Sequence, residues 1–104
     1  MKYITKAIAK KLPPLYSQES NPDPIVYAKF FSPYNGWTWY AYEYDGEDLF
    51  FGWVDGLEQE FGYFSLTEFK EAEKKFGKNK LKMVERDLWF EPKPLSECMA
   101  LHQR

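Results

Sequence analysis

Hydrophobic and aromatic positions alternate with polar ones through the middle of the chain, and this period-two pattern predicts β-strands. The predicted strands cover residues 25–31, 37–44, 49–55 and 57–64, and a fifth covers residues 83–90. Turn-forming residues, among them Asn35-Gly36, Asp45-Gly46 and Gly56, separate the first four strands. Because these connections are short, each of the four strands is expected to pair antiparallel with the next, as a meander.

The period changes to that of an amphipathic helix after residue 64. Ser65 and Glu68 form a capping-box pattern ahead of apolar residues at helical spacing, which predicts a helix over residues 66–76 that stops at Gly77. A shorter helix is predicted over residues 4–12, where Thr5 is a capping residue and two prolines follow. The predicted fold class is α+β, an antiparallel sheet of four or five strands in which both helices pack on one face.

The chain has 104 residues, so residues 1–104 are expected to form a single compact domain. At this size folding hides roughly 65% of the unfolded chain's surface, which is enough for a core that needs no metal or disulfide. Pro92 and Pro94 break the last predicted strand, and the segment from about residue 92 to residue 104 is predicted to be a loose tail.

Aromatic residues make up 20% of the chain, as nine Phe, eight Tyr and four Trp. Along the second predicted strand Trp37 and Trp39 alternate with tyrosines, so both faces of the sheet are aromatic, whereas one face of a half-exposed sheet is ordinarily polar. The helices can cover one face, and an uncovered aromatic face is typical of a binding surface. The residues predicted to bind a partner there are Tyr40, Tyr42, Tyr44, Trp53, Glu58 and Glu60.

Charge is distributed unevenly around a net value of −2. No Lys or Arg occurs between Lys29 and Lys70, whereas eight Asp and Glu residues do. Such asymmetry bears on partners rather than on the fold, and an acidic rim around aromatic residues favours a basic partner protein.

The residues that would support nucleophilic or metal chemistry are few. Cys98 and His102 are the sole residues of their types and lie near the C-terminal end, where side chains are usually poorly held. One Cys and one His fall short of a zinc site, and the six glycines are scattered singly. The sequence therefore predicts that the protein is not an enzyme and takes no cofactor.

Carboxylates leave two further alternatives open. The turn at residues 45–48 carries three acids that could bind a divalent cation, although turn acids are usually only solvated. Glu58 and Glu60 lie on one face of a strand and could act as the acid and base of a hydrolase, although a solvent-facing edge is the commoner meaning.

The chain has no apolar stretch approaching the roughly 18 residues of a membrane span, so no membrane partner is expected. Its single cysteine is typical of a reducing compartment, and its first residues lack the apolar core of a secretory signal. A cytoplasmic protein is therefore expected.

Short strings spread over the chain resemble a known family. They are VYAKFF at 26–31, WTWY at 37–40, EYD at 43–45, FFG at 50–52, GYFSL at 62–66 and ERDL at 85–88. Together they resemble the DUF2958 family, small bacterial proteins of unknown function that are often found on plasmids and integrative elements. The resemblance spans most of the chain and implies a bacterial, cytoplasmic accessory protein of mobile DNA. It implies no catalytic residues, because the family has no assigned activity.

The leading hypothesis is a non-enzymatic protein-binding module, monomeric or homodimeric, whose aromatic and acidic surface docks on another protein. A defence nuclease is one partner that the mobile-DNA context implies, with the acids mimicking DNA phosphates. The alternative is a single-stranded nucleic-acid-binding domain, in which the aromatic face stacks on bases and a basic helix end contacts phosphates. The residues assigned to phosphates in this alternative are Lys74, Lys75, Lys78 and Lys80. It requires that the basic helix end border the aromatic face.

Overall fold

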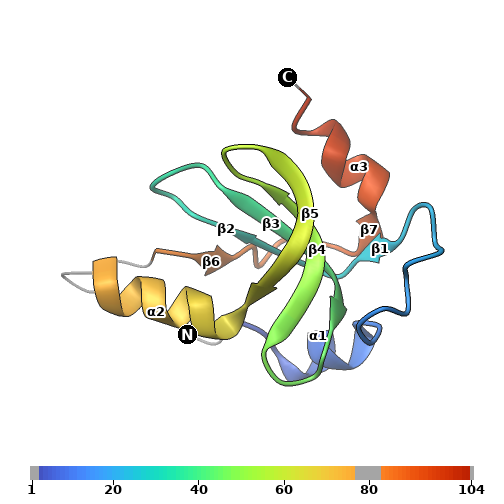
Figure 1. Cartoon of the computed structure of the whole chain (residues 1–104), viewed down its shortest axis with the longest axis horizontal. Coiled ribbons are helices and arrows are strands. Elements are labelled where there is room, and N and C mark those ends of the chain that lie inside the picture. Colours follow the sequence, from blue (N-terminus) through green and yellow to red (C-terminus); the bar gives the residue numbers. More distant parts are fainter. Residues whose placement is uncertain (1–2, 77–82, 104) are drawn as a thin grey trace.

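In the part of the chain that the structure describes, five antiparallel strands form the main sheet, in the spatial order β5-β4-β3-β2-β6 (Figure 1). The computed structural model describes residues 3–76 and 83–103. The strands of this sheet are β2 (Ala28–Phe31), β3 (Thr38–Tyr44), β4 (Leu49–Asp55), β5 (Gln59–Ser65) and β6 (Glu85–Arg86). A second, two-stranded sheet pairs β1 (Ile25–Val26) with β7 (Lys93–Pro94), and the helices are α1 (Lys6–Lys11), α2 (Leu66–Phe76) and α3 (Leu95–Ala100).

The α+β class and the antiparallel meander are confirmed. Strands β3, β4 and β5 lie within two residues of their predicted bounds and pair in chain order. The predicted strand at 25–31 is instead divided, because its first part pairs with β7 and its second part with β3. The predicted strand at 83–90 is reduced to β6, because Asp87 starts a turn: its carboxylate accepts from the amide of Trp89 and its carbonyl from that of Phe90.

Helix α2 begins directly where β5 ends, and side chains fix this junction. The Ser65 hydroxyl accepts from the Glu68 amide and donates to the Glu68 carboxylate, as the capping-box pattern predicts. Asp48 in the β3–β4 turn accepts from the amide and the hydroxyl of Thr67, at 2.8 and 2.9 Å. The helix therefore leaves the sheet in a defined direction, and the predicted stop at Gly77 lies outside the described residues.

One face of the sheet carries the larger hydrophobic core and is called the α2 face here. Phe30, Phe50 and Phe64 form its centre, and Phe30 and Phe64 contact Phe69 of α2. Residues before and within α1, among them Tyr3 and Ile8, pack against the same cluster. The Thr5 side chain caps α1 by accepting from the Ile8 amide, as predicted.

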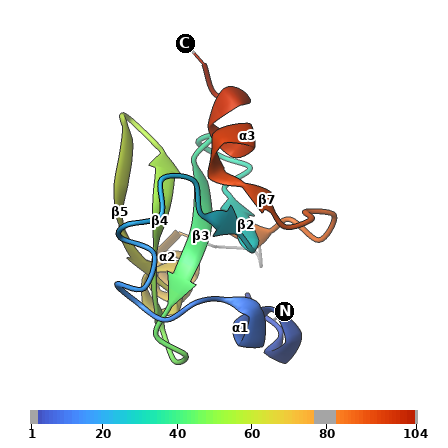
Figure 2. The ribbon, with the colours of Figure 1, turned by 90° about the vertical axis from the view of Figure 1, so that its right-hand side faces the viewer.

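The opposite face, called the α3 face, is covered by the C-terminal segment (Figure 2). The expected loose tail contains instead the helix α3, whose Leu95 and Cys98 are buried against Val26 and Tyr40. The part of the chain that the structure describes thus has three helices rather than the two predicted, and the third lies on the face opposite α2. None of these helices has the length and apolar character needed to cross a bilayer.

A register shift between Ala41 and Glu43 reverses the alternation of β3. Tyr40 and Tyr42 belong to the α3 face, but Tyr44 belongs to the α2 face and stacks on Phe50 at 4.5 Å between ring centroids. The prediction that all three tyrosines share one face is therefore wrong for Tyr44, because a bulge adds one residue to the strand.

Candidate functional site

The aromatic residues predicted to form an open face are buried. Tyr40, Tyr42 and Trp53 have exposed fractions of 0%, 6% and 3% beneath α3 and the segment before it. Tyr44 is buried on the other face. The expected docking surface is therefore not open at these four positions: three of them belong to a second core on the α3 face and Tyr44 belongs to the core of the α2 face, so a partner would have to dock elsewhere on the sheet.

A chain of polar contacts holds the C-terminal segment over this second core. The Tyr40 hydroxyl lies 2.6 Å from Nε2 of His102, and the other ring nitrogen, Nδ1, lies 2.8 Å from a carboxylate oxygen of Asp55. The side-chain amide of Gln59 donates to the carbonyl of His102, and Trp53 packs against the imidazole. Burial raises the pKa of Tyr40 well above its ordinary value. Because Tyr40 is completely buried, this arrangement fastens the chain end and does not expose a hydroxyl to a substrate.

The role of His102 was not detectable in the sequence, where its position near the chain end argued against an ordered environment. Tyr40 lies in β3, Asp55 ends β4 and His102 lies in the turn after α3, and no spacing along the chain links the three residues. The register Thr38↔Asp55 and Tyr40↔Trp53 places them together on the α3 face only after β3 and β4 pair.

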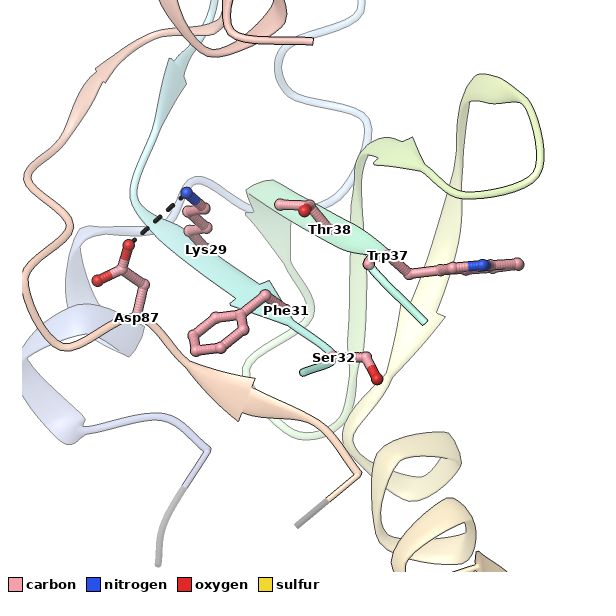
Figure 3. Close-up of a pocket in the computed structure, with 7 residues that line it drawn as sticks. Lys29, Phe31, Ser32, Trp37, Thr38 and Asp87 are labelled. Atoms are coloured by element: carbon pink, nitrogen blue, oxygen red, sulfur yellow. Dashed lines mark ion pairs between the residues drawn. The ribbon is translucent and has the colours of Figure 1, made fainter. Parts of the chain in front are cut away.

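A pocket of about 410 Å³ lies beside this cluster, near the β2–β3 connection and the turn after β6 (Figure 3). Lys29 and Asp87 point toward each other across it, with 3.7 Å between Nζ and Oδ2, and Phe31, Trp37 and Thr38 contribute further walls. The Lys29 ammonium also lies 5.6 Å from the centre of the Tyr40 ring. Since the ammonium is already paired with a carboxylate, the pocket offers no uncompensated charge from this pair to a ligand.

The acidic turn at residues 45–48 is occupied by contacts within the chain. One carboxylate oxygen of Asp45 accepts from the amides of Glu47, Asp48 and Leu49. Burial acts to raise the pKa of Asp45, but the hydrogen bonds from these amides together hold that pKa below its ordinary value. Asp48 caps α2 as described, so two of the three acids serve the fold in this arrangement.

Strand β5 is a terminal strand of the main sheet and forms one margin of the molecule (Figure 2). Its Phe61 and Tyr63 are 54% and 48% exposed and lie next to each other on one face of the strand. Glu58 and Glu60 are also exposed on this hairpin. A long edge strand with exposed apolar side chains is an open template for pairing with another chain.

The pairing with β4 shows which groups of β5 face outward. The amide of Leu66 donates to the carbonyl of Asp48, and that of Gly56 donates to the carbonyl of Glu58. Along an antiparallel ladder, pairs of opposite residues that exchange backbone hydrogen bonds alternate with pairs that do not. With Val54 opposite Glu60 and Gly52 opposite Gly62, even-numbered residues of β5 bond to β4, whereas the amides and carbonyls of Gln59, Phe61 and Tyr63 point away from the sheet.

The two sides of this edge differ. Phe61 and Tyr63 lie opposite Trp53 and Phe51, on the α3 face. There a hollow of about 310 Å³ is lined by Phe51, Phe61, Tyr42 and Leu95, and by polar residues that include Glu43, and Glu19 of the loop before β1. The Glu43 carboxylate already accepts from two loop amides. Glu60 lies opposite Val54 on the α2 face, where a hollow of about 340 Å³ is lined by Trp37, Val54, Gly56, Leu57, Glu58 and Glu60.

Of the residues assigned to partner binding from the sequence, Glu58 and Glu60 lie on the surface and adjoin this edge. The sequence pattern does not mark Phe61 and Tyr63, the aromatic residues beside them, as partner-binding residues, because it does not reveal which strand lies at the edge of a sheet.

The arrangement required for nucleic-acid binding does not form among the described residues. Lys74 and Lys75 are on α2, while Tyr40 and Trp53 lie on the opposite face. Lys78 and Lys80 lie outside the described residues.

The fold and this edge define a small α+β domain with an open, acidic and aromatic sheet margin. The chain belongs to the family described as Protein of unknown function (DUF2958), whose profile matches residues 3–104. This confirms the family resemblance found in the sequence. No curated protein and no solved structure matches the chain.

Proposed function

We propose that the protein is a non-enzymatic protein-binding module that docks through the edge of its sheet formed by β5. The observation that carries this proposal is the exposure of Phe61 and Tyr63 on a terminal strand whose outward backbone groups have no partner among residues 3–76 and 83–103. Strand addition at such an edge gains main-chain hydrogen bonds and obtains its specificity from alternate side chains. An accessory role in bacterial mobile elements, including docking on a defence nuclease, belongs to the same proposal.

Charge supports a basic partner. Glu58 and Glu60 flank the edge, and the sequence supplies no Lys or Arg between Lys29 and Lys70 to neutralise them. Complementary charge mainly raises the association rate and suppresses wrong partners, whereas buried aromatic residues supply most of the affinity. On this proposal the phenyl ring of Phe61 and the phenol of Tyr63 are the anchors and the glutamates select the partner.

Site-specific photo-cross-linking in the host cell tests the proposal. A photoreactive phenylalanine at position 61 is compared with the same group at position 70, which is exposed on α2. We expect a reproducible protein adduct from position 61 that is absent from position 70 and lost in the double variant Glu58→Lys, Glu60→Lys. Identical adducts from both positions, or none from position 61, would contradict the proposal, and an adduct that survives the double variant would contradict its electrostatic part.

A further inference from the structure

We infer that the partner adds to β5 as an extended strand that is apolar on one side and carries Lys or Arg on the other. The inference rests on the proposed function and specifies the chemistry of its partner. Three features of the edge support it: the outward backbone groups, the aromatic hollow on the α3 face, and the acidic hollow on the α2 face.

The backbone of β5 sets the conformation of the occupant. The outward amides and carbonyls of Gln59, Phe61 and Tyr63 are spaced two residues apart, as the ladder with β4 requires. Only another extended chain presents donors and acceptors at the same spacing. A helix satisfies its own backbone groups, so it would leave these outward groups unpaired.

The α3 face of the edge determines which side chains the added strand carries on one of its sides. Phe61 and Tyr63 extend the aromatic row of the sheet to its margin, and the ring of Tyr63 lies 4.8 Å from that of Phe51. The hollow beside Phe61 continues inward to Tyr42 and Leu95. Alternate side chains of an added strand would project over these groups, and apolar side chains would remove the exposed rings from water.

The α2 face of the edge determines which side chains the added strand carries on its other side. Trp37, Val54 and Leu57 give the hollow there an apolar lining, and Glu58 and Glu60 place two carboxylates beside it. An Arg or Lys side chain matches this combination, because its aliphatic stem packs on apolar surface while its charged head pairs with carboxylates. The indole of Trp37 adds a surface suited to a cation.

A second copy of this chain fits the edge less well. Pairing β5 with β5 of another copy would bring a second Glu58 and Glu60 to the same margin, and the residues from Phe30 to Phe69 supply no cation to offset them. A partner strand with alternating apolar and basic residues satisfies both faces at once.

Fluorescence anisotropy of a labelled peptide tests the inference. The peptide is as long as β5, seven residues, and alternates Val with Arg. Two control peptides keep its composition and charge: one groups the arginines together, and one carries N-methyl groups on alternate amides, which blocks pairing along one edge. We expect saturable binding of the alternating peptide and at least about tenfold weaker binding of both controls, as expected for the loss of several hydrogen bonds.

Variants of the protein locate the binding. Phe61→Pro removes an outward amide without touching the ladder to β4, and Phe61→Ala removes the ring alone, so Phe61→Pro is expected to bind the peptide more weakly than Phe61→Ala. Glu58→Gln with Glu60→Gln is expected to weaken binding and flatten its salt dependence, while Lys70→Ala leaves binding unchanged. If Phe61→Pro does not fold, the comparison between the methylated and unmethylated peptides still decides the matter.

Each contrary result has a definite meaning. Equal binding of all three peptides reduces the interaction to net charge and overturns the inference, as does no binding at all. A dimer in sedimentation equilibrium that Phe61→Pro dissociates would make a second copy the occupant and overturn the basic partner. An adduct at position 61 with no strand-specific peptide binding would leave the proposed function standing and reject this inference, whereas the absence of both would reject both.

Discussion

The hydroxyl of Tyr40, in the middle of the sheet, lies 2.6 Å from Nε2 of His102, 62 residues further along the chain. The imidazole is held on its other side by Asp55 at the end of β4, at 2.8 Å. Helix α3 is thus held in place beyond its last residue, over the core that includes Tyr40, Trp53 and Cys98.

Removing the Tyr40 hydroxyl is expected to weaken this attachment. Tyr40→Phe keeps the ring and its packing but leaves a partly buried imidazole nitrogen without its partner, which should lower the free energy of unfolding by about 1–2 kcal/mol. Urea denaturation followed by tryptophan fluorescence measures the effect. The matched control is Tyr34→Phe, at an exposed position between β2 and β3, and equal effects of the two substitutions would show that the contact with His102 adds no stability.

The Cys98 thiol is expected to make the protein sensitive to alkali. Burial raises the pKa of this thiol from 9.0 to about 11, so the unfolded chain ionises it at a lower pH than the folded chain does. The resulting stability is fully present below pH 9 and is lost as the pH rises toward about 11. Buried tyrosines act in the same direction at higher pH, since burial raises the pKa of Tyr42 to about 12.

Cys98→Ala isolates this contribution. The variant is expected to lose stability between pH 9 and about 11 with a shallower slope than the parent, measured by urea denaturation across that range. Identical slopes would show that the thiol has the same pKa in the folded and unfolded chains.

Glu43 is buried and fixes the loop that leads from α1 to β1. Its two carboxylate oxygens accept from the amides of Tyr16 and Gln18, both at 2.8 Å. Glu43→Gln replaces one acceptor by an NH₂ group facing an amide donor, and the free energy of unfolding should fall by about 2 kcal/mol. Glu47→Gln, at an exposed position of the next turn, is expected to be neutral in the same denaturation experiment, and a matching loss in both variants would contradict this role of Glu43.

The sequence was informative where local chemistry decides the structure. Period-two patterning located β3, β4 and β5, and the pair Ser65 and Glu68 marked the start of α2, because these signals depend on neighbouring residues. The bulge that turns Tyr44 to the α2 face leaves no such signal, since Tyr42-Glu43-Tyr44 alternates in the same way with or without it. The sequence does not predict that α3 covers one face of the sheet, for a related reason. The buried residues of α3 pack only against strands that are far away along the chain.

The candidate site was predictable only in part. Glu58 and Glu60 were identified from charge patterning, which survives folding because charged side chains remain at the surface. Which aromatic residues remain beside them depends on strand order, and a strand becomes an edge only when the rest of the sheet is assembled. Phe61 and Tyr63 therefore differ from Phe51 and Trp53 in their place within the sheet, not in their local sequence pattern.

The bulge in β3 begins opposite a glycine of β4, Gly52. A Cβ atom on Gly52 would lie 1.8 Å from the carbonyl oxygen of Tyr40, a distance that requires the backbones of β3 and β4 to move apart. Gly52→Ala is expected to lower the free energy of unfolding by at least about 3 kcal/mol, because backbone rather than a mobile side chain must shift. Gly62 is the control, since it lies directly opposite Gly52 on β5 and its added Cβ would meet nothing within 4 Å.

Gly62→Ala is accordingly expected to change the free energy of unfolding by no more than about 0.5–1 kcal/mol. The change should be an increase, because alanine restricts the unfolded chain more than glycine does. Thermal and urea denaturation of the two variants side by side measure the contrast. Comparable stabilities would mean that β3 and β4 tolerate a wider separation at the bulge. In that case the turning of Tyr44 away from Tyr40 and Tyr42 would not depend on a glycine at position 52.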